Sequence, residues 1–142
     1  MAHQVTVFAE NKPGRLGRIT RILADAGANI RAFTIADSGD FGVLKFVVDS
    51  PEVAHKALSD AGLVARKREI LAIEMEDRPG GLSRITQLLE ERGINILDAT
   101  AFLSGEEGKA VLLLETERIP EAERVVAGAG LRTLSDEEIY SL

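Results

Sequence analysis

The chain has 142 residues, a hydrophobic fraction of 45% and a net charge of −6, a composition typical of globular proteins. No apolar run approaches the roughly 20 residues that span a bilayer, which argues against a membrane protein. The chain has no cysteine and only two isolated histidines, His3 and His55, which excludes disulfides and argues against a cysteine or histidine metal site. Since the N-terminus lacks the pattern of a secretory signal, we expect a cytoplasmic protein.

The charge is divided unevenly along the chain. Residues 1–68 contain ten Lys and Arg against seven Asp and Glu, a net charge of +3, whereas residues 69–142 contain seven against sixteen, a net charge of −9. The two halves therefore attract one another, while the overall negative charge disfavours nonspecific binding to nucleic acid or anionic lipid.

The first half of the chain predicts four strands and two helices. Residues 5–10 alternate as a strand, and after a break at residues 11–14 apolar residues recur at helical spacing up to Gly27. Residues 30–36 and 43–48 then predict a hairpin around the turn at residues 37–40.

The second helix of this half should begin at Ser50 and Pro51. Ser50 is suited to cap the helix and Pro51 to occupy its first turn. This helix should end near Gly62, and a fourth strand should start at Leu63.

The second half repeats the first. A shift of 66 positions aligns PGRLGRITRILADAGANIRAFT (residues 13–34) with PGGLSRITQLLEERGINILDAT (residues 79–100), identical at eleven of twenty-two positions. Two copies of this length with internal strands and helices indicate duplicated compact domains rather than a solenoid. We place the first domain at residues 1–68 and the second at residues 69–142.

The second copy should contain the same series of elements. It begins with a strand at residues 70–76, continues with a helix around Leu82–Leu89 and a hairpin of residues 94–102 and 109–115, and ends with a helix over residues 119–126. At the C-terminus, the spacing of Ser135 and Glu138 matches a capping box and predicts a short helix.

The order βαββαβ, found twice, predicts an α+β protein of two tandem ferredoxin-like units. Each should be an antiparallel sheet with both helices on one face. Residues 111–114 are apolar at consecutive positions, so we expect the other face to be covered in the second copy. Association of sheets, within the chain and between two chains in a homodimer, would provide that cover.

One turn has the same pattern of glutamate, proline and glycine in both copies, ENKPG at residues 10–14 and EDRPG at residues 76–80. Proline fixes the entry to the helix, and glycine lets the backbone approach a ligand closely. The free N–H groups of the first helical turn would then attract a carboxylate or similar anion. The structural alternative is that the Pro-Gly pair only starts the helix and binds no ligand.

A second repeated pattern, GANI at residues 27–30 and GINI at residues 93–96, places an asparagine just before a strand. Asn29 and Asn95 are equally suited to a simple turn after the helix, since Asn tolerates left-handed and turn conformations.

Together these motifs resemble the ACT domain, the regulatory module of many enzymes of amino-acid metabolism. The resemblance covers nearly the whole chain as two tandem copies, and ENKPG is similar to the effector-binding turn of serine-inhibited phosphoglycerate dehydrogenases. It departs from that turn at Ala9 and Met75, where those dehydrogenases have histidine.

The resemblance implies an amino-acid effector at an interface between two ACT domains, held by the turn of one domain and the second strand of its neighbour. Carried over to this sequence, the ligand-binding positions are Asn11, Gly14, Arg15, Leu16, Asn29, Ile30, Asp77, Gly80, Gly81, Leu82, Asn95 and Ile96.

The two copies differ within this set at Asn11 and Asp77. A carboxylate at Asp77 could pair with an ammonium group, whereas Asn11 could both donate and accept. We therefore expect the two sites to bind unequally.

Other functions find less support. Arg15, Arg18 and Arg21 could contact phosphates, but a solvated helix face is the simpler interpretation. No nucleophile and base, phosphate loop or metal spacing stands out, so we predict no catalytic residue, metal or cofactor, and no enzyme.

The sequence thus predicts an allosteric, amino-acid-binding regulatory protein that acts on a separate metabolic enzyme or regulator. The alternative is an interaction or oligomerisation module that senses no ligand.

Overall fold

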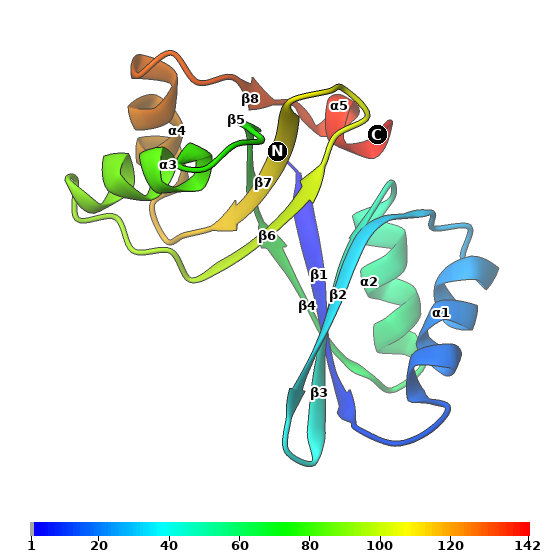
Figure 1. Cartoon of the computed structure of the whole chain (residues 1–142). Helices are drawn as coiled ribbons and strands as arrows, with labels where there is room; N and C mark the ends of the chain where they lie inside the picture. Colours follow the sequence, from blue (N-terminus) through cyan, green and yellow to red (C-terminus); the bar gives the residue numbers. More distant parts are fainter. Residues whose placement is uncertain (1) are drawn as a thin grey trace. The chain divides into compact units, whose positions relative to one another are not determined.

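The computed structural model describes residues 2–142 and divides into two compact units (Figure 1). The first unit comprises His3–Arg68 with Ser141, and the second comprises Glu69–Tyr140 with Ala2 and Leu142. In the described part of the chain, no helix is long and apolar enough to cross a membrane.

The elements of the first unit are β1 (His3–Glu10), α1 (Arg15–Asp25), β2 (Ile30–Ser38), β3 (Phe41–Val48), α2 (Pro51–Asp60) and β4 (Val64–Glu69). Those of the second are β5 (Leu71–Glu76), α3 (Gly81–Glu90), β6 (Asp98–Leu103), β7 (Lys109–Glu115), α4 (Ile119–Gly128), β8 (Thr133–Leu134) and α5 (Asp136–Tyr140).

Each unit is a four-stranded sheet, ordered β2-β3-β1-β4 in the first and β6-β7-β5-β8 in the second. The two central pairings, β1 with β3 and β5 with β7, are antiparallel. Figure 1 shows α1 and α2 on the same side of their sheet, and α3 and α4 on the same side of theirs. The predicted pair of ferredoxin-like βαββαβ units is confirmed.

The core of each unit lies between its helices and its sheet. In the first unit, Ile19 and Leu23 of α1 and Leu58 of α2 are buried against alternate residues of β1 and β3 such as Val7 and Phe46. The second unit repeats this layer with Ile85, Leu89 and Val126 against Ile73 and Leu112. Burial of an aliphatic side chain contributes about 1.5–3 kcal/mol, so these layers determine which face of each helix turns inward.

Two local predictions need correction. Ser50 precedes α2, but its side chain makes no capping hydrogen bond and donates instead to the carboxylate of Asp49, at 3.1 Å. Pro51 does stand in the first turn of α2.

The second correction concerns β6, which was predicted to start at residue 94 and starts at Asp98. Ile94 is buried in the core, and its amide closes the end of α3 by donating to the carbonyl of Leu89. Ladder bonding to β7 begins only at Leu97, whose amide donates to the carbonyl of Glu115. A loop whose apolar residues pack in the core therefore has the same sequence pattern as a strand.

The sheet face opposite α3 and α4 is also buried along β7, as the sequence predicted. Val111 and Leu113 point away from the helices, and each is only 2% exposed. Ile139 of α5, the short C-terminal helix, is also buried.

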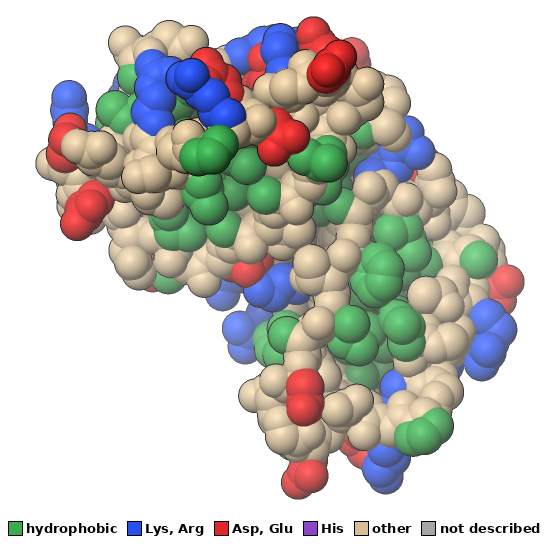
Figure 2. Space-filling view, viewed as in Figure 1, with side chains coloured by type: hydrophobic (Ala, Val, Ile, Leu, Met, Phe, Trp, Pro, Cys, Tyr) green, Lys and Arg blue, Asp and Glu red, His purple; other side chains and the backbone are tan. Residues whose placement is uncertain are grey.

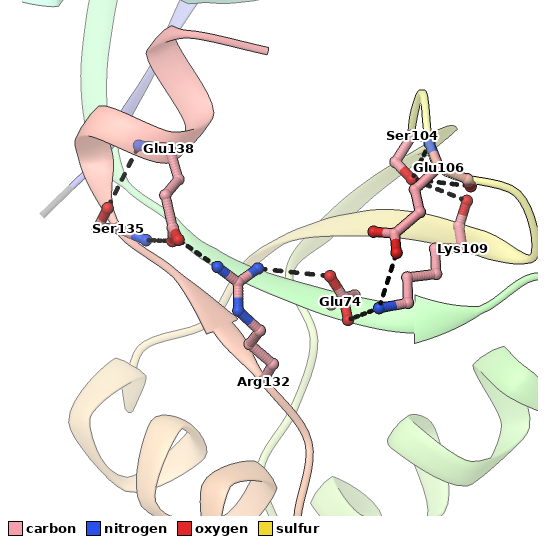
Figure 3. A network of polar contacts seen from close by, with 7 residues as sticks. All are labelled: Glu74, Ser104, Glu106, Lys109, Arg132, Ser135 and Glu138. Carbon is pink, nitrogen blue, oxygen red and sulfur yellow. Dashed lines mark hydrogen bonds and ion pairs between the residues drawn. The ribbon is translucent and has the colours of Figure 1, made fainter.

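A chain of polar contacts connects α5 to the β6–β7 hairpin (Figure 3). Arg132 contacts both Glu138 and Glu74, and Glu74 in turn pairs with Lys109 at 3.1 Å. Ser135 and Glu138 form the predicted capping box, with the Glu138 amide donating to the Ser135 hydroxyl and the Ser135 amide donating to the Glu138 carboxylate. The hydrogen bond from the Ser135 amide is the main cause that lowers the pKa of Glu138.

Replacement of Ser135 by alanine should loosen α5 without disturbing either sheet. An N-cap side chain contributes about 1 kcal/mol, so exchange of the Ile139 amide, which bonds to the carbonyl of Ser135, should accelerate roughly fivefold. Hydrogen exchange followed by NMR measures this, and unchanged exchange would contradict the role of the capping box.

The same measurement tests the charge of Glu138. Because folding lowers its pKa, the stabilisation is present at neutral pH and is lost as the pH falls through the lowered pKa of the folded state. Glu138→Gln should remove this pH dependence from the exchange of α5 amides.

Candidate functional site

The turn between β1 and α1 leaves three backbone amides open in the first unit. Gly14 stands before α1 with a φ of 88°, a left-handed conformation that favours glycine. The amides of Asn11 and Arg15 are used within the fold, by the carbonyls of Asp40 and Lys12. Within residues 2–142, the amides of Gly14, Leu16 and Gly17 have no acceptor.

The corresponding turn of the second unit has the same arrangement. Gly80 precedes α3 with a φ of 91°, and the amides of Asp77 and Gly81 donate to the carbonyls of Gly108 and Arg78. In the described chain, the amides of Gly80, Leu82 and Ser83 are left open. Of the predicted positions, Arg15 and Gly81 thus have their amides engaged, whereas Gly14, Leu16, Gly80 and Leu82 offer theirs.

A cavity lies beside each turn, at the same place in the repeat. That of the first unit has a volume of 240 Å³ and that of the second 280 Å³. The first is lined by Phe8, Ala9, Glu10, Arg15, Phe41, Gly62, Leu63 and Val64. The second is lined by Met75, Glu76, Arg78, Pro79, Gly80, Gly81, Arg84 and Leu131.

The cavities differ in the charges at their rims. In the first, Glu10 pairs with Lys12 at 2.7 Å and with Arg15 at 3.8 Å, and the hydrogen bond from Lys12 is the largest cause that lowers the pKa of Glu10. In the second, Glu76 pairs with Arg78. In each turn, basic residues of the same turn therefore neutralise the glutamate carboxylate. The carboxylate then does not cancel the partial positive charge of the helix start.

The side chains of Asn11 and Asp77 have different surroundings. The Nδ2 atom of Asn11 donates to the carboxylate of Asp37 at 3.0 Å, which leaves its Oδ1 atom to accept. In the second unit Leu103 replaces Asp37, and within residues 2–142 the exposed carboxylate of Asp77 has no hydrogen-bond or ion-pair partner.

The asparagines of the second motif lie at the opposite end of each sheet from the turns. Glu10 is opposite Phe41 at one end of β3, whereas Ile30 is opposite Val48 at the other. Asn29 is exposed there, and its amide and carbonyl both bond to Asp49.

In the second unit, Asn95 and Ile96 precede β6, whose first residue is opposite Glu115 at the far end of β7 from Lys109. A single unit thus brings together the turn and the helix start but not the asparagine motif.

Arg18 and Arg84 have a structural role that the sequence analysis missed. Arg18 donates to the carbonyl of Ala61 at 3.0 Å, and Arg84 donates to the carbonyl of Ala129 at 2.8 Å. Each arginine thereby connects the first helix of its unit to the end of the second. Their identical place in the repeat, 66 positions apart, was the available signal.

A larger cavity, of 450 Å³, lies between α3 and α4 and includes Arg92, Glu121 and Arg124. The side chain of Arg118 already pairs with Glu121 and donates to the carbonyls of Arg92 and Gly93. The positions that correspond to Arg92 and Glu121 in the first copy are Ala26 and Val53, so the repeat does not share this groove.

The sequence model of the family described as "ACT domain pair" matches residues 1–142. The chain belongs to the ACT domain pair family. ACT domain pairs are regulatory modules, and the predicted resemblance is confirmed over the whole length of the chain. No curated protein matches the sequence.

Several solved structures share the fold. Protein BT0572 from Bacteroides thetaiotaomicron superposes with a TM-score of 0.90 at 28% identity, over 99% of this chain and 96% of that one. The ligand-free regulatory subunit of aspartate kinase from Thermus thermophilus gives a TM-score of 0.66 at 19% identity, over 90% and 92%. The corresponding subunit from Thermus flavus gives 0.66 at 20% identity, over 91% and 93%.

Gly81 should be the least replaceable glycine of the ACT pair. A Cβ atom added there would stand 2.1 Å from the carbonyl oxygen of Glu76, so the turn would have to move. We expect Gly81→Ala to destabilise the second unit by about 1–3 kcal/mol, a fall in melting temperature of several degrees. Differential scanning calorimetry measures this.

Gly105→Ala is the matched control. A Cβ atom at Gly105 meets nothing within 4 Å, so this variant should melt like the parent protein. Equal melting temperatures for the two variants would show that the close approach of Glu76 does not constrain the turn.

Proposed function

We propose that the chain is a regulatory protein that binds a free amino acid at the turns before α1 and α3, in ACT domains formed by residues 1–68 and 69–142. The observation that carries this proposal is the recurrence, in both units, of a helix start with open amides and of a cavity lined by other residues of the same turn. Open amides occur at the start of any helix, so the cavity at the same place in both units is what distinguishes these two turns.

The two ends of an amino acid fit different groups of each site. The open amides at Leu16 and Gly17, or at Leu82 and Ser83, suit a carboxylate, which is favoured at a helix N-terminus by about 0.3–1 kcal/mol in exposed positions. The unpaired carboxylate of Asp77 suits the ammonium group. The side chain of Asn11 offers only a neutral oxygen, and the neighbouring carboxylate of Asp37 already accepts a hydrogen bond from it, so binding at the second unit should be tighter.

Each cavity wall contains an apolar part beside its charged residues, and this part suits an apolar ligand side chain. Ala9 lines the first cavity and Met75 lines the second. Both stand where the dehydrogenases that this turn resembles have histidine. Leu63 and Leu131 line them at equivalent positions of the repeat. We therefore expect aliphatic amino acids to bind more tightly than polar ones.

The regulated activity would belong to another protein, since the proposed sites bind and do not catalyse. A ligand that binds one conformation or association state better than another shifts the equilibrium by the difference in its affinities. Such a chain would act in trans on a metabolic enzyme or regulator.

A thermal-shift panel of the twenty amino acids tests the proposal. An amino acid present at one hundred times its Kd should stabilise the protein by about 2.7 kcal/mol, which raises the melting temperature by roughly 10 °C or more. No shift with any amino acid at millimolar concentration would contradict sensing of free amino acids and favour a purely interacting module.

Asp77→Asn tests the assignment of the ammonium group. Loss of the charge-assisted bond should weaken binding to the second unit by roughly tenfold in isothermal titration calorimetry. Glu90→Gln, which removes a carboxylate from the other end of α3, should bind like the parent. Two equivalent sites in the parent protein would contradict the expected inequality.

A further inference from the structure

The groove between the two helices of the second unit is separate from the turns. It lies between α3 and α4, has a volume of 450 Å³ and shares no lining residue with the cavity beside the turn before α3. Figure 2 shows both basic and acidic side chains at the end of the second unit where α3 and α4 lie. We call it the α3–α4 groove, and its lining includes Leu88, Arg92, Arg124, Val125 and Gly128.

Two arginines of this groove have guanidinium groups that are not paired. Arg92 follows the end of α3, and Arg124 belongs to α4. Within residues 2–142, neither guanidinium group has a hydrogen-bond or ion-pair partner. The pKa of the Glu121 carboxyl is lowered, mainly by the hydrogen bond from Arg118 and to a smaller extent by Arg124 and Arg92. Both free guanidinium groups therefore lie near the same carboxylate of the groove.

The first copy of the repeat neutralises the charge that corresponds to Arg124. The equivalent residue is Lys56, which pairs with Asp60 at 2.6 Å, one turn further along α2. At the position of Asp60 the second copy has Gly128, which lines the groove. The second copy therefore has both a free positive charge and open space where the first copy has an ion pair.

The acidic residues of the groove do not cancel its two free charges. Glu121 is already paired with Arg118, whose Nε atom donates to it at 2.8 Å. Glu91 is the other acidic residue of the lining, and it is exposed. Three arginines (Arg92, Arg118 and Arg124) thus stand against two glutamates, a net charge of +1 in a half of the chain that carries −9. An anion is the ligand that this local excess attracts.

The groove also has the size and the apolar surface of a small-molecule site. Leu88 and Val125 line it and are half-buried. Its volume lies within the range of about 300–1,000 Å³ that is usual for small ligands. The net charge of −6 of the whole chain disfavours a nucleic acid or an anionic membrane as the source of the anion.

We propose that the α3–α4 groove binds a small molecule that carries a phosphate group, with the phosphate between Arg92 and Arg124 and the uncharged part against Leu88 and Val125. A phosphate has three acceptor oxygens and a charge of about −2 at neutral pH, so it can engage two guanidinium groups at once. A carboxylate has a single charge and would leave one arginine uncompensated. This site is independent of the turns and holds whether or not they bind an amino acid.

Phenyl phosphate is a probe that contains both parts of the proposed ligand. In an NMR titration of the isotope-labelled chain at constant ionic strength, the side-chain Nε–H groups of Arg92 and Arg124 and the amide of Gly128 should shift and saturate. Benzoate, which has the same ring with a carboxylate, should bind roughly tenfold more weakly. Equal binding of benzoate, or no saturable shift at these positions, would overturn the proposal.

Gly128→Asp tests the free charge of Arg124, because it places a carboxylate where Asp60 stands relative to Lys56. A Cβ atom at Gly128 meets nothing within 4 Å, so the variant should melt like the parent protein. It should weaken the binding of phenyl phosphate roughly tenfold, whereas Gly128→Asn, equal in size and uncharged, should bind like the parent. Equal affinities of the two variants would contradict the role of Arg124.

Two further substitutions test the position of the site. Arg92→Gln should also weaken the binding of phenyl phosphate roughly tenfold. Lys56→Gln, at the equivalent of Arg124 in the first unit, should leave it unchanged. The reverse result would place the anion in the first unit and overturn the proposal.

The pH dependence of binding tests the choice of a dianion. The charged groups around the proposed phosphate are Arg92, Arg118, Arg124, Glu91 and Glu121, and none of these described residues is a histidine. The second pKa of a phosphate monoester is about 6, so the affinity for phenyl phosphate should rise roughly fivefold from pH 5 to pH 7.5. A flat profile would indicate recognition of a single negative charge and contradict the assignment.

A lipid headgroup presents the same phosphate chemistry, and sedimentation with vesicles that contain phosphatidic acid distinguishes the two sources. The chain should remain in the supernatant, since its net charge is negative. Sedimentation of the parent protein that Gly128→Asp abolishes would overturn the assignment of the groove to a small diffusible molecule.

Discussion

A glycine in the left-handed conformation at the start of a helix is the constraint on which both candidate sites depend. At Gly14 and Gly80 the chain leaves the central strand and turns into the helix with φ near 90°, a region that side chains with a Cβ atom disfavour. This conformation allows the helix to begin within a few residues of the strand's end. The first-turn amides, open as at any helix start, therefore lie close to the end of the central strand.

The two copies keep this turn but surround it differently. Arg15 carries a side chain where Gly81 has no room for one, because the carbonyl of Glu76 occupies the space. Asn11 is held by Asp37, whereas Asp77 is free within the described chain. Duplication thus preserved the backbone of the site, and divergence changed its charge.

Hydrophobic periodicity and the repeat were sufficient to predict the βαββαβ order, since each apolar stripe corresponds to one face of a helix or strand. The capping box at Ser135 and Glu138 was equally predictable because both partners lie within one helical turn. The start of β6 was not, since Ile94 and Ile96 pack in the core from a loop and are as apolar as strand residues.

The contacts of Arg18 and Arg84 with distant carbonyls also required the tertiary structure. They join residues 43 and 45 positions apart, and no local pattern specifies such pairs.

The arginine links have a mechanical consequence for the ACT pair. Arg84 lines the second cavity and holds the carbonyl of Ala129, two residues before Leu131 on the opposite wall. Arg18 ties α1 to Ala61, two residues before Leu63, in the same manner. Each arginine thus joins the first helix of its unit to the segment that leads into a cavity residue, so a rotation of that helix would displace Leu63 or Leu131 with it.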